Sequence, residues 1–426
     1  MKDRILFKRH SRFWFLFKGL SPNTVFDDRP IKNMKICLIN NLYKPYTRGG
    51  AEVIVELISQ GLLNKNIEVV VISTMPFFVK NLPIVENKIN IKNYYLSSNY
   101  YNLSKMPKFF RLFWHFFDLF NFFICNKVEN ILIKENPDIV ITHNLKGLSY
   151  LLPRVIKKLR IKHIHYLHDI QLIYPSGLMI YGQEQQNQKF FAKIYQIICC
   201  RLFGSPDTVI SPSKWLLDYH KNKKFFPNSK KIVLANPTPV FAKNFKNKLI
   251  KNNVFQFLYV GQIDDHKGII FLINVFNKLI KENKKNISLI IAGDGSKLDD
   301  IKKNINKKYI NILGKIDRES VAKYLNQVDC LIVPSLCYEN SPTVIYEAFS
   351  MGLPVIASKI GGITELMKDN QEMLFEPGNK DDLINKILFV INNPEELKKI
   401  SQKELEFIKD LSLEKYLEKL LRICCD

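Results

Sequence analysis

Two glutamates eight residues apart, Glu339 and Glu347, flank the start of a predicted helix. A buried strand, DCLIVPS, leads into the loop that carries Glu339, and Ser341 and Pro342 are residue types favoured at helix starts. Free backbone amides at such an end bind phosphate, and the helix dipole strengthens the attraction. Glu347, one to two turns into the helix, is placed to accept hydrogen bonds from ribose hydroxyls. The segment therefore predicts a site that holds a phosphate and a ribose.

Small or polar residues also follow two apolar strands in the first half of the chain. Gly49 and Gly50 come after the run MKICLIN, and glycine there allows the backbone to approach a ligand closely. His168 ends the run KHIHYLHD, at the carboxyl edge where doubly wound sheets bind ligands. Strand alternation puts His163 and His165 on the face opposite His168, so we expect no zinc site.

The order of predicted elements is strand, loop, helix, strand, repeated in two halves. Most of the strands are continuous apolar runs, which is typical of parallel sheets covered on both faces. A stretch crowded with Pro, Asn and Lys separates the halves and reads as a linker. The sequence thus predicts an α/β protein with two doubly wound, Rossmann-like domains. We expect a basic, aromatic extension, a first domain, a linker, a second domain and an amphipathic C-terminal helix at 1–33, 34–238, 239–254, 255–408 and about 409–426.

The chain has 426 residues, and its 63 Lys and Arg against 40 Asp and Glu give a net charge of +23. That excess favours anionic partners such as nucleotide phosphates or an acidic membrane surface, although Lys, Asn and Ile are abundant throughout, as biased genomic composition also produces. The eight cysteines include no C-x-x-C pair and read as small core residues in a reducing compartment. No run is apolar and long enough to span a bilayer, so we expect a cytoplasmic protein.

An aromatic run at 109–124 is apolar nearly all round, within a long helix predicted over 109–137. Either the helix covers the core of the first domain, or it faces a membrane or a lipid acceptor. Lys105, Lys108 and Arg111 lie close by, and the sequence leaves both interpretations open.

The segment CYENSPTVIYEAFSMGLPVIASKIGGITEL (337–366) resembles the donor-binding region of family 4 glycosyltransferases, the glycosyl transferases group 1. VGQIDDHKG, IAGDGS and VDCLIVPS match further motifs of that family in order and spacing. The resemblance is dense from 255 to 380 and thinner from 34 to 215, through GGAE, THN, HYLHD and SPS. It implies the GT-B fold, in which two Rossmann-like domains face a cleft, and a C-terminal helix that crosses back onto the first domain.

The resemblance also implies a role for each residue of the site. His168, Lys267 and Glu339 would be catalytic, with Lys267 pairing with the donor diphosphate and Glu339 contacting the sugar. Gly49 and Gly50 would form a loop near the phosphates and the acceptor. The residues that bind the donor would be Gly261, Gln262, Gly293, Asn340, Ser341, Pro342, Thr343, Val344 and Glu347. The family often has Arg where this chain has Gln262, so leaving-group stabilisation would depend more on Lys267 and the helix amides.

The implied reaction is transfer of a sugar from a nucleotide-sugar to a glycan or lipid-linked acceptor, with retention of anomeric configuration. The expected setting is cell-surface polysaccharide or glycolipid synthesis, with possible contact to the inner face of an anionic membrane. No cofactor, metal or nucleic-acid partner is expected, and the chain contains no Asp-x-Asp metal clamp. Two alternatives stay open: a nucleotide-sugar epimerase on the same architecture, and a degenerate non-catalytic homologue that binds an anionic partner.

Overall fold

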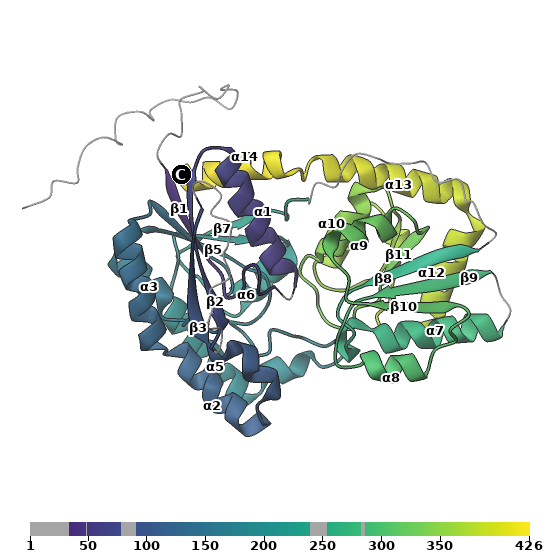
Figure 1. The fold of residues 1–426 in the computed structure, drawn as a ribbon, viewed down its shortest axis with the longest axis horizontal. Helices are drawn as coiled ribbons and strands as arrows, with labels where there is room; N and C mark the ends of the chain where they lie inside the picture. The colour runs from purple at the N-terminus through teal and green to yellow at the C-terminus, as the bar shows by residue number, and fades with distance from the viewer. Residues whose placement is uncertain (1–33, 48, 78–90, 239–253, 283–285) are drawn as a thin grey trace, which may run out of the picture.

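The computed structural model describes residues 34–47, 49–77, 91–238, 254–282 and 286–426. The predicted extension at 1–33 and nearly all of the predicted linker at 239–254 lie outside these residues. The described chain forms two α/β lobes that lie side by side, joined along one edge by the last two helices (Figure 1). The predicted α/β class with two doubly wound domains is confirmed.

The first sheet has seven parallel strands in the order β3-β2-β1-β4-β5-β6-β7. The order reverses between β1 and β4, which is where a doubly wound sheet opens a crevice for ligands. Its strands are β1 (Lys35–Ile39), β2 (Glu68–Pro76), β3 (Ile91–Ser98), β4 (Ile139–Thr142), β5 (Lys162–Tyr166), β6 (Thr208–Ser211) and β7 (Lys230–Val233). Its helices are α1 (Gly50–Asn64), η1 (Asn99–Lys105), α2 (Lys108–Leu119), α3 (Phe122–Glu135), α4 (Leu152–Lys158), η2 (Glu184–Gln188), α5 (Phe190–Phe203) and α6 (Lys214–Asn222).

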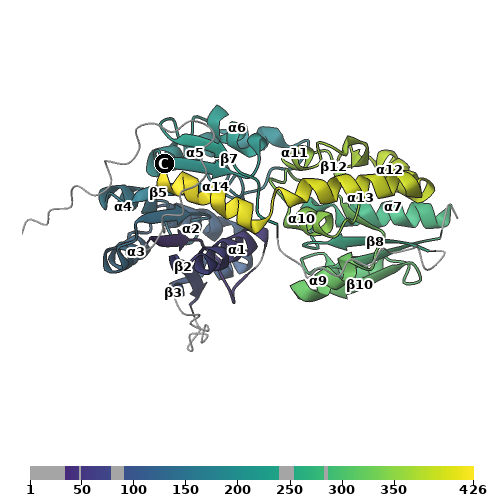
Figure 2. The ribbon, with the colours of Figure 1, turned by 90° about the horizontal axis from the view of Figure 1, so that it is seen from above.

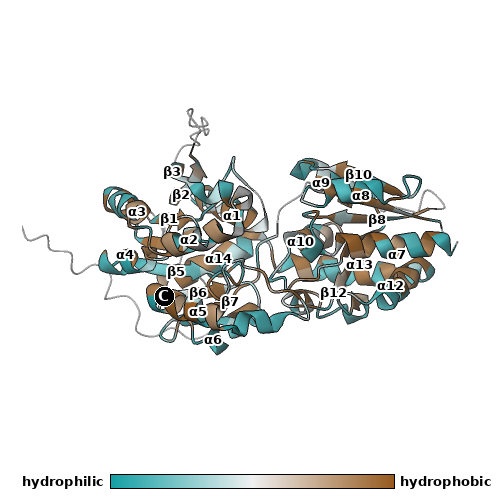
Figure 3. Ribbon diagram, turned by 90° about the horizontal axis from the view of Figure 1, so that it is seen from below, coloured by the Kyte–Doolittle hydropathy of each residue, from teal (hydrophilic) through white to brown (hydrophobic). Residues whose placement is uncertain are grey.

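Both faces of the first sheet are buried, because successive side chains of a strand point to opposite sides. In β1, Cys37 and Ile39 join the core under α2 to α6, whereas Ile36 and Leu38 join the core under α1 and the C-terminal helix. Figure 3 shows the apolar strands enclosed between helices in both lobes. All eight cysteines are free, and six of them are buried, as expected of core residues.

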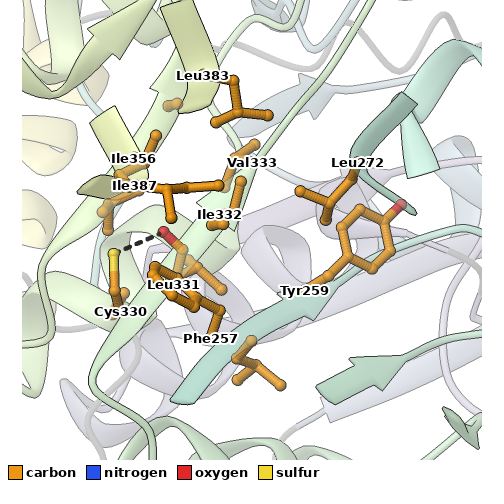
Figure 4. Close-up of a cluster of buried hydrophobic side chains, with 14 of the residues drawn as sticks. Phe257, Tyr259, Leu272, Cys330, Leu331, Ile332, Val333, Ile356, Leu383 and Ile387 are labelled. Carbon is orange, nitrogen blue, oxygen red and sulfur yellow. Dashed lines mark hydrogen bonds between the residues drawn. The ribbon is translucent and has the colours of Figure 1, made fainter. Parts of the chain in front are cut away.

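The second sheet has six parallel strands in the order β10-β9-β8-β11-β12-β13, with the reversal between β8 and β11. In its core, strand residues such as Phe257, Leu331 and Ile356 pack against Leu272 of α7 and Leu383 of α12 (Figure 4). The strands are β8 (Phe255–Val260), β9 (Ile287–Ala292), β10 (Ile310–Gly314), β11 (Cys330–Val333), β12 (Val355–Ser358) and β13 (Leu374–Phe375). The helices are η3 (Asp265–Lys267), α7 (Ile269–Lys281), α8 (Leu298–Lys303), α9 (Arg318–Leu325), α10 (Thr343–Ser350), α11 (Ile363–Leu366), η4 (Gln371–Met373), α12 (Lys380–Asn392), α13 (Pro394–Lys409) and α14 (Leu413–Cys425).

The C-terminal helix α14 crosses from the second lobe to the first, as Figure 2 shows from above. Its apolar face packs on α1, and a carbon of Leu417 would lie 2.5 Å from a Cβ placed on Gly61. Lys162 of β5 donates to the last carbonyls of the helix, those of Ile423 and Cys424, at 3.2 and 2.9 Å. The helix therefore ties the second lobe to the back of the first sheet.

The prediction of one long helix over 109–137 is wrong. The structure breaks it into α2 and α3 at Phe120 and Asn121, and the side chain of Asn121 accepts a hydrogen bond from the amide of Ile124 at 3.1 Å. Asn is a good helix N-cap, and this one starts a new helix inside an apolar run. Among the described residues, no helix combines the length and apolar character needed to cross a membrane.

Candidate functional site

A cavity of about 820 Å³ lies between the two lobes, at the carboxyl ends of both sheets. Every residue that the sequence predicted for the site lines this one cavity. They come from both lobes: Gly49, Gly50 and His168 from the first, and Gly261, Gln262, Lys267, Gly293, Glu339, Asn340, Ser341, Pro342, Thr343, Val344 and Glu347 from the second. The volume is in the range of pockets that hold a small molecule or cofactor.

Two helix N-termini meet at the cavity, one from each lobe. Helix α1 begins at Gly50 and helix α10 at Thr343, and a Cβ placed on Gly50 would lie 3.1 Å from the methyl carbon of Thr343. The N-cap of α10, Pro342, makes no side-chain hydrogen bond to the helix amides. Since free amides and helix dipoles attract anions, this junction suits a phosphate group.

The ion pair of Lys267 and Glu339 forms the polar centre of the cavity wall, with Nζ and Oε1 2.5 Å apart. Ser335, two residues after the end of β11, donates to the same oxygen at 2.9 Å. Burial favours the protonated form of Glu339, but Lys267 and Ser335 outweigh it and hold the pKa of Glu339 below its usual value. Burial also disfavours charged Lys267, and the carboxylate outweighs this and raises the pKa of Lys267. Both groups are therefore charged near neutral pH.

Glu347 lies deeper in the wall, on α10, with only 6% of its surface exposed. Its Oε1 lies 3.3 Å from the guanidinium of Arg318, the first residue of α9. Burial raises the pKa of Glu347, and the nearby guanidinium opposes that rise. Sequence reasoning missed Arg318. It follows β10 at the carboxyl edge of the second sheet, and this position was the available signal.

The sequence predicted that His168 ends its strand, but the structure ends β5 at Tyr166 and places His168 two residues beyond it. Its Nε2 lies 2.9 Å from Nδ1 of His143, so the pair shares one hydrogen bond. Burial lowers the pKa of His168 to about 3, because a charged imidazole is poorly solvated there. His168 is thus neutral at physiological pH, and a neutral imidazole offers hydrogen bonds but no positive charge to the cavity.

His163 and His165 do not line the cavity, and both contact the hydroxyl of Thr142, at 2.7 and 2.9 Å. Across the described residues, no cluster of three or more His, Cys, Asp or Glu has the arrangement of a metal site.

Glycines let the strand-end loops of the second lobe touch through their backbones. Gly293, after β9, has a φ of 153°, and a Cβ placed on it would lie 1.8 Å from the carbonyl oxygen of Gly261, after β8. No side chain fits at that distance, so glycine keeps both loops at the cavity floor. Next to Gly261, Gln262 is exposed and its carbonyl accepts from the hydroxyl of Tyr259 at 2.6 Å.

The loop that carries Glu339 and Asn340 is held by the first lobe as well as by its own. The side chain of Asn340 accepts from Ser213 Oγ at 2.6 Å and donates to the carbonyl of His168 at 3.2 Å. One residue before Glu339, the ring of Tyr338 stacks on Trp215 with centroids 5.4 Å apart. Contacts across the cleft therefore position the residues that face the cavity.

The Gly361-Gly362 turn packs against the loop that carries Glu339. The amide of Gly362 donates to the carbonyl of Glu339 at 2.8 Å, and a Cβ on Gly361, whose φ is +56°, would lie 2.4 Å from that oxygen. We expect Gly361→Ala to destabilise the fold by about 2–4 kcal/mol, because it combines left-handed strain with overpacking. Urea denaturation measures the loss.

Gly378→Ala is the matched control for this prediction. Gly378 also has a positive φ, +77°, but the nearest atom to its Cβ would be 3.9 Å away. It should lose only the about 1–2 kcal/mol of left-handed strain. Equal losses in the two variants would contradict the proposed contact between the turn and Glu339.

Two family models match the chain: Glycosyltransferase Family 4 over residues 48–240, and Glycosyl transferases group 1 over residues 240–407. An uncharacterized 42.6 kDa protein in the cps region of Klebsiella pneumoniae is 29% identical over 371 residues, 86% of this chain and 96% of that protein. The UDP-Gal:alpha-D-GlcNAc-diphosphoundecaprenol alpha-1,3-galactosyltransferase of Escherichia coli is 29% identical over 275 residues, 62% of this chain and 68% of that one.

Among solved structures, Anabaena HepE in complex with UDP superposes with a TM-score of 0.67 at 17% identity, over 92% of this chain and 99% of that chain. At this identity the likeness establishes the fold, which is two parallel sheets with helices on both faces. The two family models lie end to end and include every residue that the sequence predicted for the site. The chain belongs to the family 4 glycosyltransferases, the glycosyl transferases group 1, and has their GT-B fold.

Proposed function

We propose that this glycosyltransferase moves a sugar, with retention of configuration, from a nucleotide-sugar in the cavity to a glycan or lipid-linked acceptor. One observation carries the proposal: helix N-termini from both lobes, a Lys–Glu pair and a buried Glu converge on one cavity. That set matches the groups of a nucleotide-sugar, which are a diphosphate, a sugar and a ribose. The Klebsiella relative named for a cps region and the diphosphoundecaprenol enzyme of Escherichia coli support a role in cell-surface polysaccharide or glycolipid synthesis.

Each wall of the cavity has a part in this reaction. The amides of Thr343 and Val344 and the charge of Lys267 would bind the diphosphate and stabilise it as it leaves. Glu347 would accept hydrogen bonds from the ribose hydroxyls, and Glu339 and neutral His168 would bind the sugar.

In the proposed step, the bond between the anomeric carbon and the diphosphate oxygen breaks, and the nucleoside diphosphate departs. The acceptor oxygen bonds to the same face of that carbon, and its proton passes to an oxygen of the departing phosphate. No protein nucleophile is needed. No cofactor or metal is needed either, because Lys267 and the helix amides supply the positive charge.

A thermal-shift screen tests the donor site. Nucleoside diphosphates should raise the melting temperature, because a ligand at about 100 times its Kd stabilises a fold by about 2.7 kcal/mol. The matching nucleosides, which lack phosphates, should give a smaller shift. Equal shifts from nucleoside and nucleoside diphosphate would contradict phosphate binding by the helix N-termini.

A second assay separates transfer from epimerisation. The donor is incubated with enzyme and no acceptor, and its sugar is analysed for inversion at a ring carbon. A glycosyltransferase should return the donor unchanged apart from slow hydrolysis, whereas an epimerised sugar would replace the proposed reaction with the alternative one.

A further inference from the structure

The first lobe exposes a large group of apolar side chains on three helices. Of the seventeen large hydrophobic residues exposed in the described part of the chain, eleven lie on α2, on the first turn of α3 and on α5. Soluble proteins usually expose such residues singly, so a concentrated group marks an interaction site. We call this group the Phe surface, and it consists of Phe109, Phe110, Phe113, Phe116, Phe117, Phe122, Phe123, Phe190, Phe191, Ile194 and Ile197.

The outward direction of these side chains follows from helix geometry. In α2 they recur at helical spacing on one side, while Asp118 and Leu119 on the other side are buried. Both carboxylate oxygens of Asp118 accept from the amide of Gly147 at 2.9 Å, which anchors α2 to the domain. This contact fixes the orientation of α2 on the domain, so its phenylalanine side chains remain on the exposed face.

Helix α5 repeats the pattern of α2. Its exposed members, Phe190 to Ile197, recur at helical spacing, and Phe191 is 82% exposed. Its opposite side, including Cys199 and Leu202, joins the same core as α2 and α3. Figures 1 and 3 place helices α2 and α5 near one another, at the same end of the first lobe.

Among the described residues of α2, α3 and α5, the exposed charges without a salt-bridge partner are positive. Lys127 lies over the ring of Phe123 at 4.2 Å, and Lys189, Lys193 and Arg201 are exposed on or beside α5. Helix α5 contains no acidic residue. The acids of α2 and α3 are engaged elsewhere, because Asp118 and Glu135 are buried and Glu129 pairs with Lys158 at 2.7 Å. A surface that combines exposed aromatics with unbalanced bases complements an anionic lipid headgroup layer.

Helix α2 also connects this surface to the cavity. On its inner side, Trp114 lies 6.3 Å, centroid to centroid, from the ring of Tyr100. Tyr100, in η1, lines the cavity. The Phe surface therefore begins one aromatic residue away from the cavity wall, on the side formed by the first lobe.

We propose that the Phe surface docks on an anionic lipid bilayer, with its phenylalanines in the headgroup boundary and its bases against lipid phosphates. Docking would hold the cavity near the bilayer, where a lipid-linked acceptor is presented, and this last consequence rests on the proposed function. A second copy of the chain fits less well. A two-fold contact through this surface would bring the basic rims of both copies together, which costs energy by like-charge repulsion.

Vesicle sedimentation of the full chain tests the docking without donor or acceptor. The protein should pellet with phosphatidylcholine vesicles that contain about one third phosphatidylglycerol, and much less with phosphatidylcholine alone. Raising the salt concentration should release it, since headgroup attraction is screened. Equal binding to both kinds of vesicle, or binding to neither, would overturn the proposal.

Substitutions locate the contact. The triple variant Phe116→Ser, Phe117→Ser, Phe191→Ser should weaken binding to anionic vesicles at least about tenfold. These side chains are exposed, so the fold should survive, and an unchanged melting temperature checks this. The control Val233→Ser, Val254→Ser removes exposed apolar residues at other positions and should bind as the parent chain does.

Two double charge-reversal variants test the contribution of the basic residues independently. Lys189→Glu with Lys193→Glu should weaken binding, whereas Lys398→Glu with Lys399→Glu, on α13, should not. If the parent chain forms a dimer by light scattering and the triple variant does not, the surface belongs to a second copy and the lipid proposal fails.

Transfer to a soluble acceptor separates the two proposals. Loss of vesicle binding with retained transfer in the triple variant supports docking as a distinct property. A parent chain that binds anionic vesicles but transfers no sugar would refute the proposed function and leave the docking surface intact.

Discussion

Replacing Lys267 with alanine is expected to lower kcat for sugar transfer about 10²–10³-fold, the loss found when one preorganised group that stabilises a developing negative charge is removed. The expected size follows from the composition of the cavity. Gln262, which has no charge, stands where the family often has Arg. The predicted contact with the diphosphate therefore depends more on the charge of Lys267, which is paired with Glu339. The departing diphosphate gains negative charge as the sugar leaves, and the Lys267 side chain is held at the cavity by Glu339.

Lys297→Ala is the matched control for this variant. Lys297 also contacts carboxylates in the second lobe, those of Asp265 and Asp300 at 3.6 and 3.5 Å, and its side chain is similarly exposed at 32% against 24% for Lys267. It does not line the cavity and should leave kcat unchanged. If Lys267→Ala keeps full activity, or both variants lose activity equally, Lys267 does not stabilise the leaving group.

Loss of Lys267 also leaves Glu339 without its counter-ion in a partly buried place. A fall in activity could then arise from displacement of the Glu339 loop rather than from the lost charge. Lys267→Arg separates these causes, since it keeps the charge while changing its geometry. Partial activity in Lys267→Arg with near-zero activity in Lys267→Ala would identify charge as the essential property.

The central strands of both sheets were predictable from the sequence, and several edge strands were not. Strands such as β1, β4 and β11 are buried on both faces, so their sequences are unbroken apolar runs. The edge strands β3 and β7 carry exposed polar residues, Lys92 and Lys230 among them. Their sequences therefore resemble those of the neighbouring loops. The last strand, β13, has two residues, Leu374 and Phe375, too few to show a period.

The gathering of the site residues was predictable, but their pairing was not. Residues after parallel strands meet at one edge of the sheet, and this rule with the family motifs predicted Lys267, Glu339 and Glu347. The contacts among them depend on how separate loops pack. Ser213 and Asn340 are 127 residues apart in the chain and meet across the cleft at 2.6 Å, and local sequence carries no signal for that distance.

Glu347→Gln is expected to raise the donor KM about 10- to 100-fold and to change kcat less. Glu347 is buried, and Arg318 at 3.3 Å favours its charged form, so it is suited to accept charge-assisted hydrogen bonds from two ribose hydroxyls. Such bonds contribute about 1.5–3 kcal/mol each, and glutamine keeps the shape while losing the charge. The ribose lies away from the bond that breaks, so its contacts bind the ground state and the transition state alike and appear mainly in KM.

The buried Glu404 provides the matched control for the Glu347 variant. It is 1% exposed on α13, accepts from Asn370 at 3.3 Å and does not line the cavity, so Glu404→Gln should leave KM and kcat unchanged. Arg318→Ala gives a second check, because removing the guanidinium leaves Glu347 buried without its cation and should raise its pKa further. Donor affinity in that variant should then fall as pH drops toward the raised pKa of Glu347, since the protonated carboxyl loses its charge. An unchanged donor KM in Glu347→Gln would show that Glu347 does not bind the ribose and serves only as the partner of Arg318.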